Sequence, residues 1–298
     1  MLFQRTIRGP VTLGGIGLHS GEDVWITFLP APAGTGIIFR VGRPGERREE
    51  IRAVSENVGE TAYATTLVGG GTKIQTVEHV LAAFAGLGVD NAYVELTGAE
   101  APIMDGSARP FVDALRGAGL QTLSARKKYI KIVRPVEVRE GDKSALLLPS
   151  PVPRITCRID FSHPLIMDQE ISIDLDTASF DRELADARTF GFLRDIEMLE
   201  KAGLAKGASL DNAVVVGEEH ILNPGGLRYP DEFVRHKALD LIGDLSLAGM
   251  PIIAHAVADK PGHRLNQLLV RKLLSEKDSW IVLEGEPMLS EAGLAAAV

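Results

Sequence analysis

The feature of this chain that most constrains its fold is an order of segments that occurs twice, with strand-like runs before helix-like runs. The first half has strand-like runs at 24–29, 37–41 and 92–96, a hairpin around Gly69–Gly71, and helical patterns at 76–85 and from Pro110 to just before Gly119. The second half has strand-like runs at 130–133, 136–138, 145–148, 155–161 and 171–175, and helical patterns at 192–202, 232–248 and 266–276. Strands and helices separated along the chain in this way predict an α+β fold.

The length of the chain indicates more than one domain. Its 298 residues are about twice the size of a common single domain. Small and polar residues at 121–126 mark the change from the first set of segments to the second. We therefore predict two domains of similar two-layer topology, residues 1–125 and residues 126–298.

Composition and charge exclude several classes of protein. Hydrophobic residues make up 45% of the chain and charged residues 24%, which is typical of a globular protein that is not disordered. The net charge of −8 argues against broad nucleic-acid binding. The start lacks the apolar stretch of a signal peptide, and the weakly polar run at 245–258 is shorter than the roughly 20 residues of a membrane helix. We expect a cytoplasmic monomer without stable membrane insertion.

Cysteine usage limits the kinds of metal site that the chain can form. Cys157 is the single cysteine, so the chain has no internal disulfide and no cysteine cluster. Any metal ion must therefore be held by histidine, aspartate or glutamate.

The predicted helix at 232–248 carries a polar stripe opposite its apolar face. His236, Lys237, Asp240 and Asp244 all fall on that side of the helix. His236 and Asp240 stand four residues apart, a spacing at which two helical side chains can share one metal ion. A solvated face with a histidine–aspartate pair explains this helix equally well.

The predicted helix at 76–85 supplies a third candidate ligand. Glu78 and His79 lie away from its apolar stripe, and the neighbouring alanines give that side none of the charge typical of a solvated face. Catalytic zinc commonly takes three protein ligands and leaves a fourth position open. His79 is the best third ligand among the seven histidines, because Glu78 beside it can accept a proton from a water that the metal activates. A solvated Glu78–His79 pair is the alternative.

Several motifs, taken together, resemble the zinc-dependent UDP-3-O-acyl-N-acetylglucosamine deacetylase family of lipid A biosynthesis. They are the stretches at 76–79, 102–108 and 235–245, with Gly17-Leu18-His19 and Gly262-His263, so the resemblance covers nearly the whole chain. The long 235–245 stretch is specific, whereas the glycine-rich 14–21 stretch alone is weak. The resemblance implies hydrolysis of an N-acetyl group to a free amine and acetate, at a site between the two domains.

The resemblance also implies roles for individual residues. Zinc ligation falls to His79, His236 and Asp240, and Glu78 is implied as the general base. His263 is implied as a cation that stabilises the oxyanion and protonates the amine, with Asp244 orienting it and Thr189 donating a hydrogen bond to the oxyanion. The substrate-binding positions implied are Lys237, Lys260, Lys143, Phe161, Phe190 and His19.

The substrate positions have simpler explanations beside the implied ones. Each lysine by itself is more simply explained as a solvated surface group. The segment at 204–222, which the resemblance implies to line a passage for the acyl chain, reads by composition as a strand and a loop. Two other functions stay open: a metal amidohydrolase for another N-acyl sugar, and a non-catalytic carbohydrate- or nucleotide-binding protein. The presence of both Glu78 and His263 disfavours the second.

Overall fold

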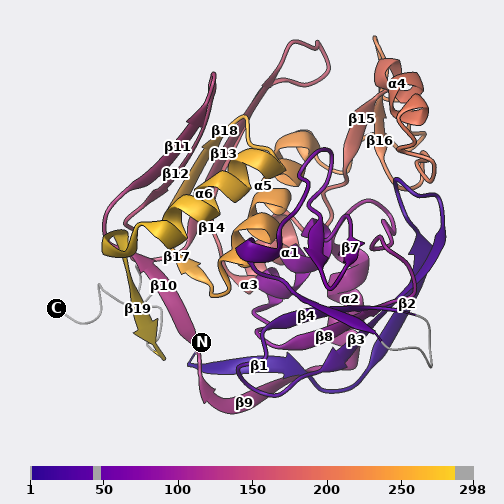
Figure 1. Ribbon diagram of the computed structural model, residues 1–298. Helices are drawn as coiled ribbons and strands as arrows, with labels where there is room; N and C mark the ends of the chain where they lie inside the picture. Colours follow the sequence, from indigo (N-terminus) through magenta and orange to yellow (C-terminus); the bar gives the residue numbers. More distant parts are fainter. Residues whose placement is uncertain (1, 43–47, 286–298) are drawn as a thin grey trace.

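Two five-stranded sheets, with helices packed between them, form most of the fold (Figure 1). The structure is a computed structural model that describes residues 2–42 and 48–285. The sheets are mainly antiparallel and the helices pack on their inner faces, in agreement with the predicted α+β class. No helix of the described ranges is long and apolar enough to cross a membrane.

The first sheet is built by the first half of the chain. Its strands, in spatial order, are β2 (Val11–Ile16), β3 (Asp23–Pro30), β8 (Ala92–Leu96), β4 (Ile37–Val41) and β5 (Glu49–Arg52). In β3, Ile26 and Phe28 are buried while Trp25 is exposed, so one face of the sheet packs inward. Helices α1 (Glu78–Leu87) and α2 (Arg109–Ala118) cover that face, where Phe28 contacts Phe84 and Phe111 edge-on.

The second sheet is built by the second half of the chain. Its strands, in spatial order, are β11 (Val136–Glu140), β12 (Lys143–Leu148), β18 (His255–Asp259), β13 (Arg154–Phe161) and β14 (Met167–Asp174). Helices α5 (Glu232–Leu245) and α6 (His263–Ser275) lie on it (Figure 1). Alternation in β13 buries Cys157 on the covered face, where it packs as a small apolar residue.

Shorter elements complete the described part of the chain. Their strands are β1 (Phe3–Ile7) with β9 (Leu120–Arg126), β6 (Leu67–Gly69) with β7 (Thr72–Ile74), β15 (Phe190–Phe192) with β16 (Val214–Val216), and β10 (Lys128–Ile132) between β17 (Ile252–Ile253) and β19 (Trp280–Glu284). The short helices are α3 (Thr177–Glu183) and α4 (Ile196–Lys201). The predicted boundary after residue 125 falls at the end of β9, and the division into two domains stays a prediction.

Close packing of α1 against α5 joins the two halves. A Cβ atom added to Gly243 of α5 would lie 2.2 Å from the carbonyl oxygen of Glu78, so the two helix backbones approach each other directly. A Cβ atom on Gly86 would likewise lie 2.2 Å from the ring of Phe180, a residue of α3. Glycine is therefore required at both positions, and the first contact brings the polar sides of α1 and α5 together.

Three predicted helices differ in detail from those observed. The predicted helix 192–202 shortens to α4, because Phe190–Phe192 pairs with β16 as a strand. Helix α6 begins at His263, three residues before the predicted start. Helix α5 ends at Leu245, and a 3-10 turn then leads to Gly249 in the left-handed conformation. At the start of α5, the Asp231 carboxylate accepts a hydrogen bond from Arg235 at 2.6 Å and does not cap the helix backbone.

Candidate metal and catalytic centre

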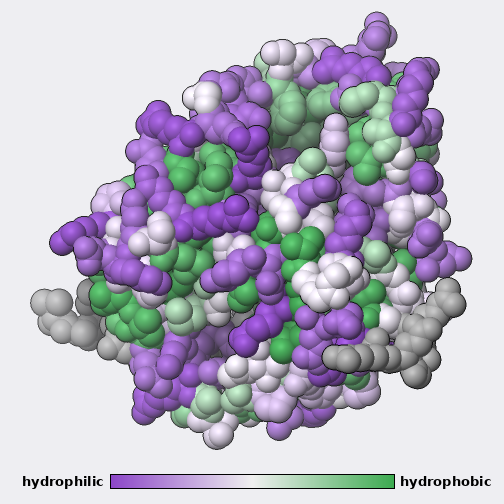
Figure 2. Space-filling model, viewed as in Figure 1, coloured by the Kyte–Doolittle hydropathy of each residue, from purple (hydrophilic) through white to green (hydrophobic). Residues whose placement is uncertain are grey.

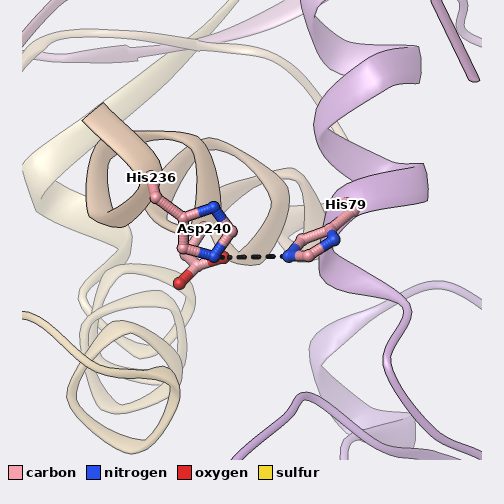
Figure 3. Close-up of side chains that lie close together, drawn as sticks. All are labelled: His79, His236 and Asp240. Atoms are coloured by element: carbon pink, nitrogen blue, oxygen red, sulfur yellow. Dashed lines mark ion pairs between the residues drawn. The ribbon is translucent and has the colours of Figure 1, made fainter. Parts of the chain in front are cut away.

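Three side chains from α1 and α5 form a buried group with the character of a metal site (Figure 3). His79 projects from the first turn of α1, and His236 and Asp240 project from successive turns of α5. One ligand atom from each lies within 4.8 Å of the others. The Asp240 Oδ1 atom is 3.6 Å from His79 Nε2 and 3.4 Å from His236 Nε2. The three residues are only 2–3% exposed, which rules out a solvated face.

The hydrogen bonds of His236 and Asp240 leave one ligand atom of each residue available to a cation. The Nδ1 of His236 donates to the carbonyl oxygen of Ala187 at 3.0 Å, so its Nε2 keeps a lone pair directed at the group. Lys237 Nζ donates to Asp240 Oδ2 at 2.7 Å, whereas Asp240 Oδ1 accepts no hydrogen bond from any residue that the structure describes. An unpartnered buried carboxylate oxygen beside two imidazoles fits a divalent cation, and this donor set suits Zn²⁺.

The protonation states of the ligands also favour metal binding. Burial lowers the pKa of His236 to about 3, so its imidazole is neutral at physiological pH. Burial alone would raise the pKa of Asp240, but the nearby His236 and Lys237 outweigh it and hold that pKa well below its usual range. A neutral imidazole and an ionised carboxylate are the forms that bind metal ions.

Glu78 places a carboxylate next to the ligand group. Its Oε2 accepts a hydrogen bond from the backbone N–H of Thr65 at 3.0 Å, which fixes the side chain. Its Oε1 lies 4.0 Å from His263 Nε2. Burial raises the pKa of Glu78, against the opposing effect of His263 and His79. A carboxylate whose pKa is raised toward neutrality is a stronger base than an exposed one.

Asp244, one turn beyond Asp240 on α5, holds His263 in place. Its Oδ2 accepts from His263 Nδ1 at 2.9 Å and from the Asn266 amide at 2.8 Å, and its Oδ1 accepts from the Thr65 hydroxyl at 2.5 Å. Burial lowers the pKa of His263, but Asp244 and Glu78 outweigh it and raise that pKa to about 9. His263 is therefore a cation at neutral pH, with Nε2 turned toward Glu78.

Thr189 belongs to a segment that contacts the ligand group through its backbone. It follows Ala187, whose carbonyl oxygen binds His236, and its own N–H donates to Gly106 O at 2.8 Å. A buried ion pair between Arg188 and Glu232, at 2.8 Å, anchors this segment to the start of α5. Thr189 thus stands two residues after the carbonyl group that binds His236.

Aromatic residues continue from the ligand group to the surface. The Phe190 ring lies 6.3 Å from the His236 ring and 5.8 Å from the Phe161 ring, and Lys237 Nζ lies 5.7 Å from the Phe190 ring centre. His163, for which the sequence offered no partner, packs on Phe192 at 5.3 Å. The space-filling view shows apolar surface in a recess between the β13–β14 strands and the β15–α4 segment, at the top of the molecule (Figure 2).

The remaining predicted substrate positions lie outside the ligand group. Lys260 Nζ pairs with Asp142 at 2.8 Å and Asp160 at 3.3 Å, and Lys143 is exposed at the start of the neighbouring strand β12. His19 is buried, its backbone N–H donates to Glu100 at 2.8 Å, and burial lowers its pKa despite that carboxylate. The lysines therefore form a separate polar group at one end of the second sheet.

Sequence reasoning missed two residues that hold Glu78 and Asp244 in place. Thr65 binds both Glu78 and Asp244, and no pattern around it pointed to this role. Asn266 lies one helical turn after His263 and donates to Asp244. A helix predicted to start at Gly262-His263 would have placed Asn266 on the same side as His263.

Comparison with known proteins identifies the family of the chain. Residues 4–275 match the profile of a family described as UDP-3-O-acyl N-acetylglycosamine deacetylase. Two curated relatives, both named UDP-3-O-acyl-N-acetylglucosamine deacetylase, come from Pseudomonas entomophila and Marinobacter nauticus. Each is 51% identical over 285 residues, which is 95% of this chain and 94% and 93% of the respective relative. The chain therefore belongs to the UDP-3-O-acyl N-acetylglycosamine deacetylase family.

Proposed function

We propose that this protein hydrolyses the N-acetyl group of UDP-3-O-(3-hydroxyacyl)-N-acetylglucosamine to a free amine and acetate, the committed step of lipid A biosynthesis. The observation that carries the proposal is a buried carboxylate and a cationic imidazole beside a three-ligand group. Their nearest atoms, Glu78 Oε1 and His263 Nε2, are 4.0 Å apart. A base and an acid at one metal site are what amide hydrolysis requires.

The ligand group fits one zinc ion, held by His79, His236 and Asp240. Zinc supplies Lewis-acid polarisation of the substrate carbonyl and lowers the pKa of water. The chain supplies the proton transfers. Glu78 accepts the proton of the attacking water, because the Thr65 N–H fixes one carboxylate oxygen and leaves Oε1 facing the site.

His263 acts on the opposite side of the reaction. As a cation held by Asp244, it stabilises negative charge on the carbonyl oxygen and then gives its Nε2 proton to the departing amine. The Thr189 hydroxyl adds a hydrogen bond to that oxygen. The location of Thr189 beside the His236 contact supports this role.

Substrate binding is assigned to the surfaces around the centre. Phe190 packs against the sugar, because its ring lies 6.3 Å from the His236 ring. Lys237, whose Nζ lies 5.7 Å from the Phe190 ring centre, binds a phosphate group. Lys260 also binds the phosphates, and Lys143 and Phe161 bind the nucleotide. The acyl chain follows the segment at 204–222, with His19 beside it, because the His19 carbonyl and ring contact Lys206 and Ala205. The acidic composition with one cysteine supports a monomeric enzyme of the cytoplasm.

Acetate release from the UDP-acyl-sugar, measured with the zinc-loaded protein, tests the proposal. Glu78→Gln should lower kcat at least about 100-fold while zinc content stays at one per chain, because general-base catalysis contributes about that much. Glu56→Gln, at an exposed position, is the matched control and should be fully active. A chelator should abolish the activity, and zinc should restore it.

Two results would contradict the proposal. Turnover by Glu78→Gln at the rate of the unmodified protein would remove Glu78 as the base. Equal rates for substrates with and without the 3-O-acyl chain would favour an amidohydrolase for other N-acyl sugars.

A further inference from the structure

A cavity of about 500 Å³ lies behind the α1–α5 pair and is not part of the candidate catalytic centre. Its walls come from both halves of the chain. The first half contributes the later turns of α1 and residues near Ile37 and Arg52, and the second contributes the end of α5 with Leu147 and Ile155. A volume of this size is within the range of cavities that bind small organic molecules.

Helix geometry places this cavity on the far side of the helices that hold the metal ligands. Leu81 lines the cavity and stands two residues after His79, and Ile242 lines it two residues after Asp240. Residues two apart on an α-helix point about 200° from each other around the axis. The cavity and the ligand group therefore occupy opposite sides of the same two helices, and a molecule in one does not occupy the other.

The walls of the cavity are mainly apolar. Leu81 and Phe84 of α1, Ile242 and Leu245 of α5, and Leu147 of the second sheet all line it. They are buried under the helices and sheets that frame it. Such walls favour an apolar body over a polar solute.

Positive charge is in excess among the lining residues. Arg52, Lys127, Lys128 and Arg154 line the cavity, against the carboxylates of Asp90 and Asp176. Lys127 pairs with Asp90 at 2.8 Å, and Arg154 pairs with Asp174. Arg52 and Lys128 are exposed and form no ion pair with any residue in the described part of the chain. Two exposed cations therefore border an apolar interior.

We propose that this cavity is a second ligand site, which takes an acyl chain with an anionic head group. The chain lies along the apolar walls of α1 and α5, and the head group stays between Arg52 and Lys128. The apolar walls disfavour polar solutes, and the two cations favour a negative charge at the border of the cavity. Together, these features favour an anionic amphiphile as the ligand.

The site is tested by calorimetric titration of the full, zinc-loaded protein with decyl phosphate below its micelle concentration. Inorganic phosphate and decanol are the matched probes, because one carries only the head group and the other only the chain. Ala85 is exposed on α1 and lines the cavity, so Ala85→Phe narrows it without replacing a buried side chain. Ala202→Phe, at an exposed position at the end of α4, is its control.

A second variant tests the charge. Lys128→Gln removes one of the two exposed cations, and Lys131→Gln, on the same strand β10 but away from the cavity, is its control. We expect decyl phosphate to bind at one site per chain of the unmodified protein. Its affinity should be at least about 10-fold lower for Ala85→Phe and several-fold lower for Lys128→Gln. The control variants should bind as the unmodified protein does, and both other probes should bind more weakly.

The proposal is overturned if decyl phosphate binds Ala85→Phe and Lys128→Gln with unchanged affinity. The proposal also fails if the UDP-acyl-sugar displaces decyl phosphate while both variants bind the probe as tightly as the unmodified protein does. The probe would then occupy the catalytic centre. Inorganic phosphate bound as tightly as decyl phosphate would show an anion site without a role for the cavity walls, and would contradict the proposal too. Acetate release is not needed for any of these readouts, so a failure here leaves the proposed function intact.

Discussion

Replacement of Asp244 by asparagine should shift the pH range in which this protein is active. Asp244 accepts hydrogen bonds from His263, Asn266 and Thr65, and it is almost fully buried. Asparagine keeps the shape of the side chain but removes its negative charge. The main consequence falls on His263, whose cationic form depends on that charge.

The size of the effect follows from the pKa of His263. Burial lowers this pKa, and Asp244, with help from Glu78, raises it to about 9, against an ordinary value of 6.5. Without the Asp244 carboxylate, burial dominates again and the pKa falls to about 6.5 or below. At pH 7.5 the cationic fraction of His263 then drops from about 97% to about 10% or less.

The assay is the pH dependence of kcat/KM for acetate release, which reports groups of the free protein. For Asp244→Asn, kcat/KM should fall at least about 10-fold at pH 7.5. Its decline on the alkaline side should begin more than two pH units lower, because the His263 cation is lost as the pH rises through the lowered pKa. Asn266→Ser, which leaves the His263–Asp244 hydrogen bond intact, is the control. If Asp244→Asn lowers the rate equally at every pH, His263 is not the group that limits activity on the alkaline side.

Three further substitutions test contacts around the centre. Thr65→Val removes a buried hydroxyl donor to a carboxylate and should cost about 1.5–3 kcal/mol in urea unfolding, whereas an unchanged midpoint would contradict the contact. Gly243→Ala adds a Cβ atom 2.2 Å from the Glu78 carbonyl oxygen, so both the melting temperature and zinc retention should fall, and a fall in neither would show that α1 and α5 are not in close contact. Glu232→Gln leaves Arg188 as a buried, unpaired cation and should lower stability by about 3–5 kcal/mol; thermal unfolding at the original temperature would argue against that ion pair.

Local sequence patterns predicted the longer elements of the fold. The strands β3, β4, β8 and β13 follow from β-branched and aromatic runs, and α1, α2 and α5 follow from apolar periodicity. The strands β1 and β9 pair across more than 100 residues, and β17 has only two residues, so no local pattern could reveal them. Whether residues 1–125 and 126–298 fold as separate domains stays a prediction.

The candidate site was predictable where its residues share a helix. His236 and Asp240 are one turn apart on α5, so their proximity follows from helix geometry alone. The position of His79 against them depends on the backbone contact at Gly243, so residue spacing alone could not show it, although the family resemblance implied it. For the same reason the solvated-face alternative could be dismissed only when the structure showed the two polar sides buried against each other.

The pairing of Lys260 was also beyond sequence reasoning. The resemblance implied a lysine available to an anionic substrate, yet its ammonium group lies between Asp142 and Asp160. Asp142 precedes Lys143 at the start of β12 and Asp160 precedes Phe161 in β13, and these two strands lie on either side of β18, the strand that Lys260 follows. Only strand register brings them together, and a bound diphosphate would have to displace them from the lysine.

The charges gathered around the ligand group give an independent reason for a metal ion in this site. Glu78, Asp240 and Asp244 contribute three buried carboxylates. The half-buried Lys237 and the buried His263 contribute two cations, so the fully ionised set sums to −1. Isolated charges are costly to remove from water, and a surplus carboxylate in a protein interior normally gains a proton or a counter-ion. A proton on Glu78 would remove the base that hydrolysis needs, whereas a divalent cation at the unpartnered Asp240 Oδ1 leaves it free. A divalent cation therefore offsets the surplus negative charge of this site without protonation of Glu78.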